Sequence, residues 1–588
     1  MTGHDDDIIV GKAYDAALMR RLMGYLRPYW LPVLVAFTAI VSASVLQLAQ
    51  PYLMKLAIDR YIATSDVAGM DRIALLFLAI LLASFALEFV QTYVLQHTGQ
   101  RIMFDLRAQI YRHFQRLDVA YYDRNPVGRL MTRVTTDVDA LNDLFTSGVV
   151  SVFGDIFTLA GIMIVLLAMD WRMALVAFSV LPLIVVITQW FRRHVRDSYR
   201  TVRALIARIN AFLQENITGM ATVQLFGREA QNLGQFREIN GRHRDANIAS
   251  IFYYAVFYPA VEIVGALATA LIIWWGGAWV LAGTLTLGSL VAFIQYSQRF
   301  FRPISDMSEK FNLLQSAMAA SERIFTLLDT PVAVVTPASP KQAEWRGHVV
   351  FEHVWFAYDG EHHVLRDVSF EVRPGERVGV VGATGAGKST IINLLLRYYD
   401  VSGGRILIDG VDIREIDLGE LRRRFSLVLQ EVHLFSGTIS GNVRLGNPEI
   451  DDRQVRRALE AVHADRFVDA LPQGAATPVA ERGATLSTGQ KQLLSFARAL
   501  AFDPRILVLD EATSSIDTET ELLIRDALHV LMAGRTTIAI AHRLSTIQDM
   551  DTILVLHKGQ LRESGSHQEL LAQRGLYHRL YQLQYVTS

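Results

Sequence analysis

Long stretches without a charged side chain constrain this chain more than any other feature of its sequence. No charged residue occurs from Pro28 to Met54, which is long enough for one helical crossing of a bilayer at ~1.5 Å per residue. Hydrophobic residues make up 51% of the chain and its mean hydropathy is positive, which is typical of a protein that lies partly in lipid. Because 588 residues exceed what one core normally holds, a second domain is also expected.

Six spans are predicted within a helical membrane domain that covers residues 1–330. Their approximate bounds are 28–54, 73–95, 146–169, 173–191, 255–277 and 284–301. Glu88, Asp155 and Glu262 lie within or near these spans. Ionisable groups are costly there, so each is a candidate for lining a cavity or contacting a partner, and the alternative is a position in water near a span end.

The arginines of the connecting loops predict the orientation of the spans. They are concentrated before the first span, between the second and third, and after the fourth, whereas the other loops hold few. Both termini are therefore expected in the cytoplasm of a multi-pass protein of the plasma (inner) membrane. The two long basic loops are expected to continue the spans as helices, and residues 19–25 are expected to form a short interfacial helix. The acidic N-terminus lacks the pattern of a signal peptide.

The segment Gly382–Ser389 reads GATGAGKS and is flanked by an apolar strand-like run and a helix-compatible run. Such glycines let backbone N–H groups turn toward phosphates, while Lys388 is placed to reach the β- and γ-phosphates and the Ser389 hydroxyl to bind Mg²⁺. A glycine-rich turn without a ligand is the alternative, which the flanking elements disfavour. The residues expected to bind ATP here are Thr384, Gly385, Ala386, Gly387, Lys388, Ser389 and Thr390.

A proline-rich linker at 331–346 precedes a predicted soluble α/β domain at 347–588. In that domain an apolar strand at 506–509 ends in Asp510 and Glu511. Acids at the carboxyl end of a buried parallel strand suit a magnesium ligand and a water-activating base, so we assign Asp510 to Mg²⁺ and Glu511 to the general base. An ordinary strand followed by an acidic helix cap is the alternative.

The stretch LSTGQKQLLSFARAL at 486–500 resembles the signature of the ATP-binding cassette family. Further matches are Tyr358 in FAYDG, Gln430 in SLVLQEVHLFSGTI, SSID at 514–517 and His542 in AHRLSTI. In this order, and after six predicted spans, they resemble a type IV exporter half-transporter of the multidrug and lipid-flippase kind. The resemblance implies a six-helix transmembrane domain fused to an α/β P-loop ATP-binding cassette domain that hydrolyses ATP.

The resemblance also implies roles for individual residues. Tyr358 would stack on adenine, Gln430 would contact Mg²⁺ and water, and His542 would hold the γ-phosphate and attacking water in line with Glu511. The signature would close on ATP bound by a second subunit, because the N-terminus of its helix favours an anion. A dimer is therefore expected. The signature residues assigned to nucleotide are Ser487, Thr488, Gly489 and Gln490.

Thr488 departs from the family pattern, which has glycine at this position. Glycine permits close backbone approach and positive φ, and a β-branched threonine restricts both. A heterodimer, in which the partner supplies an unaltered signature to this chain's Lys388, Glu511 and His542, is therefore favoured over a homodimer.

The resemblance favours ATP-driven export of drugs, lipids or peptides of amphipathic or hydrophobic character by alternating access. Two cytoplasmic turns, 121–128 and 219–227, resemble the short coupling helices that would transmit the change. An ATP-gated channel or membrane-bound regulator is the alternative. A general nucleic-acid binder is disfavoured, since 57 basic residues balance 58 acidic ones, and the spans argue against a soluble DNA-repair ATPase. The absence of cysteine excludes disulfides and thiolate chemistry.

Overall fold

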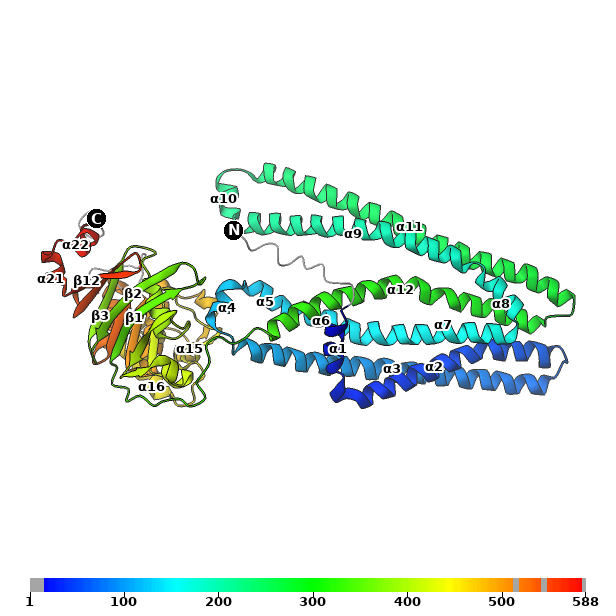
Figure 1. Ribbon diagram of the computed structural model, residues 1–588, viewed down its shortest axis with the longest axis horizontal. Helices are drawn as coiled ribbons and strands as arrows, with labels where there is room; N and C mark the ends of the chain where they lie inside the picture. Colours follow the sequence, from blue (N-terminus) through cyan, green and yellow to red (C-terminus); the bar gives the residue numbers. More distant parts are fainter. Residues whose placement is uncertain (1–14, 511–517, 541–546, 584–588) are drawn as a thin grey trace. The chain divides into compact units, whose positions relative to one another are not determined.

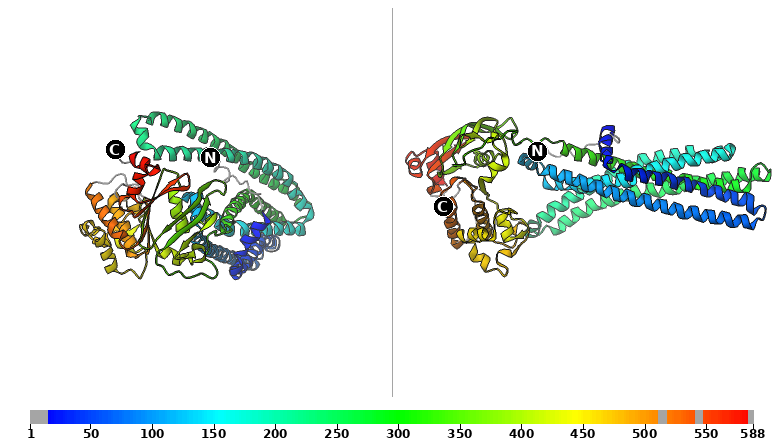
Figure 2. Two further views of the ribbon diagram at one scale, coloured as in Figure 1. Left: turned by 60° about the vertical axis from the view of Figure 1, so that its left-hand side comes forward. Right: turned by 90° about the horizontal axis from the view of Figure 1, so that it is seen from below.

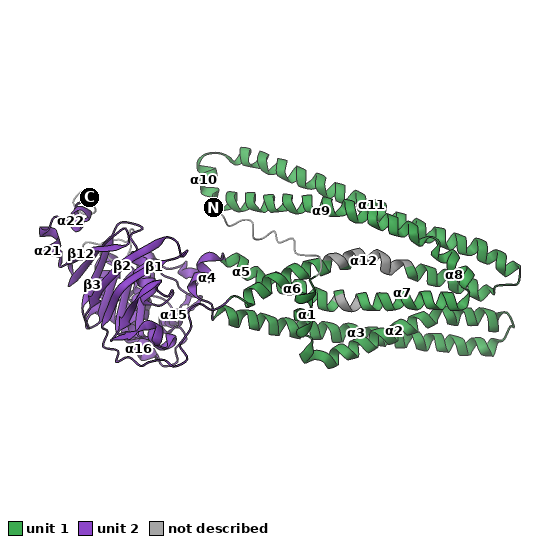
Figure 3. Ribbon diagram, viewed as in Figure 1, with its two compact units in different colours: residues 1–115, 127–330 green, residues 116–126, 331–588 purple. Residues whose placement is uncertain are grey.

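The chain forms two compact units, each described here by itself. The computed structural model describes residues 15–510, 518–540 and 547–583, without the side chains of 147, 149–151, 301–309, 311 and 312. Unit 1 comprises 1–115 and 127–330, and unit 2 comprises 116–126 and 331–588 (Figure 3). A short piece of the first long basic loop therefore belongs with the α/β domain, whereas the sequence interpretation assigned all of 1–330 to the membrane domain.

Unit 1 is built from long helices that run side by side in pairs, α2 with α3 and α9 with α11 (Figures 1 and 2). Its elements are α1 (Ala16–Gly24), η1 (Arg27–Tyr29), α2 (Trp30–Leu56), η2 (Ala57–Ile62), α3 (Val67–Phe114), α5 (Val127–Val134), α6 (Thr136–Asp143), η3 (Leu144–Gly148), α7 (Val149–Met169), α8 (Trp171–Phe178), α9 (Leu181–Thr218), α10 (Met220–Leu225), α11 (Glu229–Leu281) and α12 (Leu287–Leu328). Among the described residues, five helical stretches are long and apolar enough to cross a membrane: Arg27–Ile62, Val67–Phe114, Val152–Met169, Trp171–Thr218 and Glu229–Leu281. The sixth predicted span falls largely on α12.

The helices differ from the predicted spans in length and in one break. α3 has 48 residues and α11 has 53, so each is roughly 70–80 Å long and exceeds a ~30 Å hydrocarbon core by more than twofold. The predicted span at 173–191 is divided between α8 and α9. Pro182 lies in the first turn of α9, where proline is tolerated because its missing N–H has no helical partner.

A proline in α2 creates a hydrogen-bonding need that α12 meets. Pro51 lies inside α2 and has no N–H to donate to the carbonyl of Gln47, four residues earlier. Arg299 of α12 donates to this carbonyl at 2.6 Å and to Gln50 Oε1 at 2.8 Å. The side-chain amide of Gln47 donates in turn to Glu88 of α3 at 2.7 Å. A polar network within apolar segments therefore fastens α2 to both α12 and α3.

Acidic side chains make two further contacts between the helices of unit 1. Asp59 of η2 accepts hydrogen bonds from the Gly288 backbone N–H at 2.8 Å and the Thr286 hydroxyl at 2.6 Å, at the N-terminus of α12. Asp155 of α7 forms an ion pair with Lys310 of α12, and both side chains are mostly buried. Two of the three acids singled out in the predicted spans, Glu88 and Asp155, thus have partners within the chain.

Unit 2 is an α/β domain with a six-stranded sheet of order β12-β11-β3-β10-β9-β6, a four-stranded antiparallel sheet β2-β1-β4-β5 and a short pair β7-β8. The strands are β1 (Val349–Ala357), β2 (His363–Val372), β3 (Arg377–Gly382), β4 (Gly403–Ile408), β5 (Val411–Asp412), β6 (Phe425–Val428), β7 (Gly437–Thr438), β8 (Pro478–Val479), β9 (Ile506–Asp510), β10 (Thr536–Ile540), β11 (Thr552–His557) and β12 (Gln560–Gly565). The helices are α4 (Val119–Arg124), α13 (Lys388–Leu395), η4 (Ile413–Glu415), α14 (Leu418–Arg423), α15 (Ile439–Arg444), α16 (Asp452–Ala461), α17 (Asp465–Asp469), η5 (Gly474–Ala476), η6 (Glu481–Gly483), α18 (Thr488–Ala501), α19 (Thr518–Met532), α21 (His567–Ala572) and α22 (Leu576–Tyr581).

The central strands of the six-stranded sheet are mostly apolar, as expected for strands that are covered on both faces. β11, β3, β10, β9 and β6 run parallel, and β12 is antiparallel at one edge. The β9 residues 506–509 are at most 2% exposed. Buried parallel strands of this kind place all their carboxyl ends at one edge of the sheet, and the loops that follow them meet there.

Candidate nucleotide site

The predicted nucleotide-binding residues follow neighbouring parallel strands at the same edge of the sheet. The glycine-rich loop follows β3, Asp510 is the last residue of β9, and Gln430 lies two residues beyond the end of β6. β10 ends at Ile540, just before the predicted His542. Glu511, His542 and the run at 514–517 lie outside the described residues. The sheet order accounts for why positions so distant in sequence follow strands that end at one edge of the sheet.

Two glycines of the loop adopt backbone conformations that other residues rarely reach. Gly385 has φ 80° and Gly387 has φ 101°. A Cβ on Gly387 would also lie 2.6 Å from the Leu365 side chain, so this position excludes a larger residue by both strain and contact. Thr384, Gly385 and Ser389 are exposed at the surface of the loop, whereas Ala386, Gly387, Lys388 and Thr390 are buried.

Lys388 begins α13 and holds its ammonium group across the loop. Nζ donates to the carbonyl of Gly382 at 2.7 Å and to that of Ala383 at 3.2 Å. Burial lowers the pKa of Lys388, and the charge of Asp510 at the end of β9 opposes that shift. A buried cation whose hydrogen bonds within the described residues go to two carbonyls is suited to attract phosphate oxygens.

The donor set at this edge fits Mg²⁺. Ser389, Asp510 and Gln430 supply a hydroxyl, a carboxylate and an amide, and Ser389 and Gln430 are exposed. Within the described ranges no cluster of three or more His, Asp or Glu side chains could hold a metal by itself. Mg²⁺ commonly binds through one or two protein oxygens together with water and substrate phosphates, so a sparse oxygen set of this kind is what it requires.

Tyr358 lies beside the start of α13, and the structure adds two neighbours that the sequence interpretation did not name. Its hydroxyl is 3.1 Å from the Thr390 hydroxyl and accepts from Asn393 Nδ2 at 3.3 Å. Its ring meets that of Tyr399 edge-on at 5.1 Å. Tyr358 is 36% exposed, so part of its ring is open to a ligand. No sequence motif marks Asn393 or Tyr399, and only the fold brings them to this place.

The helix α4, which comes from the first long basic loop, packs on this aromatic cluster. Arg124 donates to the backbone carbonyl of Tyr358 at 2.7 Å, and Asp123 accepts a hydrogen bond from the Tyr399 hydroxyl. Asp118, the N-cap of α4, also accepts from the backbone N–H of Ala333 at 3.1 Å. The turn at 121–128, which resembles a coupling helix in sequence, thus bonds to Tyr358 and Tyr399.

The signature forms the first turn of α18 and closes a capping box. Ser487 Oγ accepts from the Gln490 backbone N–H at 3.2 Å, and Gln490 Oε1 accepts from the Ser487 backbone N–H at 3.0 Å. Thr488 is helical and is not among the residues with positive φ. Threonine therefore causes no backbone strain here, and its difference from glycine lies in the side chain that it exposes.

A phosphate loop at the edge of a parallel sheet, joined to helices of membrane-spanning length, defines a membrane protein with a P-loop nucleotide-binding domain. Two family models match the chain, "ABC transporter transmembrane region" over residues 33–304 and "ABC transporter" over residues 365–514. The chain belongs to the ABC transporter family, as a half-transporter of the exporter type that couples ATP hydrolysis to transport across a membrane.

Three relatives align with this chain over most of their own length. A fatty acid ABC transporter ATP-binding/permease protein of Mycobacterium tuberculosis is 39% identical over 88% of this chain and 82% of its own length. A probable multidrug resistance ABC transporter ATP-binding/permease protein of Bacillus subtilis is 38% identical over 88% of this chain and 77% of its own length. An ATP-dependent lipid A-core flippase of Syntrophus aciditrophicus is 34% identical over 97% of this chain and 94% of its own length.

Proposed function

We propose that this chain is one half of a dimeric pump that exports amphipathic or hydrophobic compounds by alternating access. The named cargoes of its relatives, a fatty acid, drugs and a lipid, are all of that character. The observation that carries the proposal is the contact of α4 with the nucleotide site. Arg124 holds the backbone of Tyr358, so a segment of the first cytoplasmic loop bonds directly to the residue expected to stack on adenine.

The site residues divide the work of hydrolysis. Lys388 and the loop N–H groups bind the phosphates of ATP, Glu511 accepts a proton from the attacking water, and His542 and Gln430 orient that water and the γ-phosphate. Mg²⁺, held by Ser389, Asp510 and Gln430, would neutralise charge on the phosphates. Glu511→Gln is expected to retain ATP binding and to lose nearly all turnover, and undiminished turnover would show that the base is another residue.

The second half of each site comes from a facing subunit. α18 presents exposed Ser487 and Thr488 at its N-terminus, where backbone N–H groups and the helix dipole favour an anion. Since one chain carries one ATPase domain, two chains are needed to enclose nucleotide. We favour a heterodimer, because the threonine side chain would meet the γ-phosphate of the partner's ATP. Robust hydrolysis by the purified chain alone would contradict this choice.

Alternating access requires that ATP binds one conformation more tightly than another. Closure of two ATPase domains on ATP provides that difference, and α4 transmits it because it belongs to unit 2 while the chain on either side of it continues into α3 and α5 of unit 1. In this scheme ATP binding opens the cavity outward and hydrolysis resets it. The ATPase domain and both termini lie in the cytoplasm, in agreement with the arginine-rich loops, and the membrane is the plasma (inner) membrane.

Transport into inside-out membrane vesicles tests the proposal against an ATP-gated channel or a regulator. Vesicles that contain this chain, with its partner where one co-purifies, are expected to accumulate a fluorescent amphiphile against its gradient only when ATP is hydrolysed. Vesicles with Glu511→Gln serve as the matched control. Ion currents gated by ATP without accumulation would contradict export and would favour a channel.

A further inference from the structure

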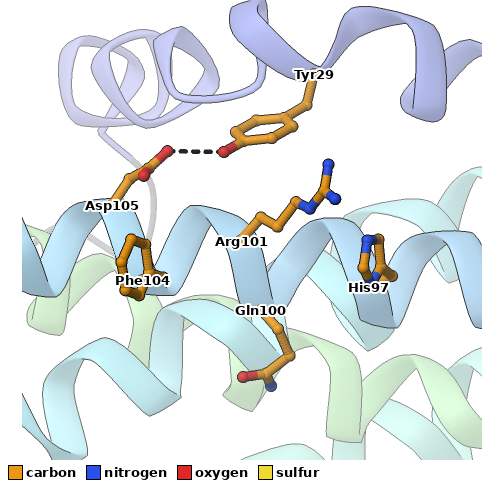
Figure 4. A pocket seen from close by; sticks show the side chains of 6 residues that line it. All are labelled: Tyr29, His97, Gln100, Arg101, Phe104 and Asp105. Carbon is orange, nitrogen blue, oxygen red and sulfur yellow. Dashed lines mark hydrogen bonds between the residues drawn. The ribbon is translucent and has the colours of Figure 1, made fainter.

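A groove of about 430 Å³ lies between η1 and α3 in unit 1. Figure 4 shows its polar wall, in which the Tyr29 hydroxyl meets Asp105 while the Arg101 side chain extends from α3 toward the same side. The residues that line the groove are Tyr29, His97, Gln100, Arg101, Phe104 and Asp105. None of them belongs to the sites described above.

Arg101 has a potential carboxylate partner that is already engaged. Asp105 lies one helical turn away on α3, the spacing at which Arg and Asp commonly pair. Asp105 instead accepts a hydrogen bond from the Tyr29 hydroxyl at 2.7 Å. Within the part of the chain that the structure describes, Arg101 forms no ion pair or side-chain hydrogen bond, and it is exposed. Its guanidinium therefore presents its donors to an external anion.

Aromatic rings lead from the groove along α3 toward the predicted span. Phe89 stacks on Tyr93 and Tyr93 on His97, each pair with ring centroids 6.0 Å apart. Phe89 and Tyr93 are each 62% exposed, and Phe104 at the other end is 72% exposed. Such a row offers an apolar surface that begins at the charged groove and runs into the uncharged stretch of α3.

The groove lies at the outer edge of the headgroup layer of the cytoplasmic leaflet. Arg101 follows the predicted end of the second span at residue 95 by about 9 Å of helix, and headgroups extend roughly 5–8 Å beyond each side of the hydrocarbon core, within reach of a long arginine side chain. Close by in sequence, the short helix α1 buries Leu22 and exposes Arg20, and Tyr25 at its end donates to Gln109 of α3 at 2.8 Å. This arrangement is typical of a helix that lies in the membrane interface.

We propose that this groove binds the headgroup phosphate of an anionic phospholipid from the cytoplasmic leaflet, with one acyl chain along Tyr93 and Phe89. The guanidinium of Arg101 supplies charge and paired N–H donors for the phosphate oxygens. A soluble phosphate would leave the aromatic row without a partner, so the structure favours a lipid. The site is separate from the transported compound, and its test does not depend on export.

Lipid retention by the purified full-length chain tests the proposal. The chain is placed in nanodiscs of phosphatidylcholine and phosphatidylglycerol, released, and analysed by native mass spectrometry for the lipids that remain bound. Arg101→Gln is expected to lower the preference for phosphatidylglycerol about fivefold, the effect of one basic side chain beside an anionic membrane surface. Arg112→Gln, also exposed on α3 but about 16 Å further into the cytoplasm, is expected to leave the preference unchanged.

Equal losses in the two arginine variants would overturn the proposal, because they would indicate general surface charge. Equal retention of the two lipids by the wild-type chain would also overturn it. So would release of the bound phosphatidylglycerol by added inorganic phosphate, because that result would indicate a site for the free anion.

A second pair of variants tests the arrangement of the groove without removing Arg101. Tyr29→Phe frees Asp105 to pair with Arg101, so it is expected to weaken phosphatidylglycerol retention although the arginine remains. Adding Asp105→Asn removes the competing carboxylate and is expected to restore retention. A double variant no better than Tyr29→Phe alone would contradict the proposed competition, since a merely structural role for Tyr29 would not be rescued by losing its partner.

Discussion

Replacing Arg299 by methionine would leave the Gln47 carbonyl without the donor that compensates for Pro51. Leaving a part-buried carbonyl unsatisfied costs about 1–3 kcal/mol in soluble proteins, and polar contacts between membrane helices average ~0.6 kcal/mol with a maximum near 1.7. Arg299 makes two such contacts, at 2.6 and 2.8 Å. We therefore expect Arg299→Met to destabilise the folded chain by about 1–2 kcal/mol.

The cause can be isolated with a second substitution in α2. Pro51→Ala returns an N–H to the position four residues after Gln47, so the carbonyl regains a helical partner without Arg299. The double variant is expected to recover about 1 kcal/mol relative to Arg299→Met alone, measured from thermal unfolding of the four proteins in detergent. If the two substitutions have simply additive effects, the guanidinium does not serve the proline-freed carbonyl and the reasoning is wrong.

Three further predictions concern unit 2. Tyr399→Phe removes the hydrogen bond to Asp123. We expect this variant to keep its basal rate of ATP hydrolysis, while the stimulation of that rate by transported compounds falls about fivefold, the equivalent of ~1 kcal/mol. Equal loss of the basal and the stimulated rates would argue against a role in transmission. Burial lowers the pKa of His567 below its ordinary 6.5, so the folded chain resists protonation of this side chain and the stability present above pH 6.5 is lost as the pH falls. His567→Phe should flatten the pH dependence of unfolding below pH 6.5. An unchanged profile would exclude His567 as its source. Thr488→Gly should raise the ATPase rate of the purified chain about fivefold, if contact of the threonine methyl with the facing phosphate raises the activation free energy by ~1 kcal/mol. An unchanged rate would remove the main reason for favouring a heterodimer.

The strand, glycine-rich loop and helix at 378–396 could be predicted from sequence because they are adjacent in the chain. Lys388 and Ser389 occur at fixed spacing after a strand, and the glycines around them have few other uses. The uncharged stretches were likewise readable, since a bilayer imposes a minimum apolar length. The exporter family followed from the signature at 486–500 and the further motifs in their order after six predicted spans, and the family matches agree with it.

The contacts that join distant segments could not be read from sequence. Tyr399 belongs to an unremarkable Arg-Tyr-Tyr run, and its approach to α4 depends on how the loop after α3 folds onto unit 2. Likewise, the role of Arg299 depends on a proline in another helix nearly 250 residues earlier. The sequence places Thr488 at the start of a helix, but only the structure shows that its φ is not positive, so that threonine fits there without backbone strain.

The central claim is that ATP hydrolysis by this chain moves an amphipathic compound in one direction. The most direct measurement is the initial rate of ATP-dependent uptake into inside-out vesicles, made in parallel for the wild-type chain and for Glu511→Gln at equal abundance in the membrane. The account predicts concentrative uptake by the wild type alone, with ATP bound by both proteins. Equal uptake by the two, or uptake that proceeds without ATP, would contradict it.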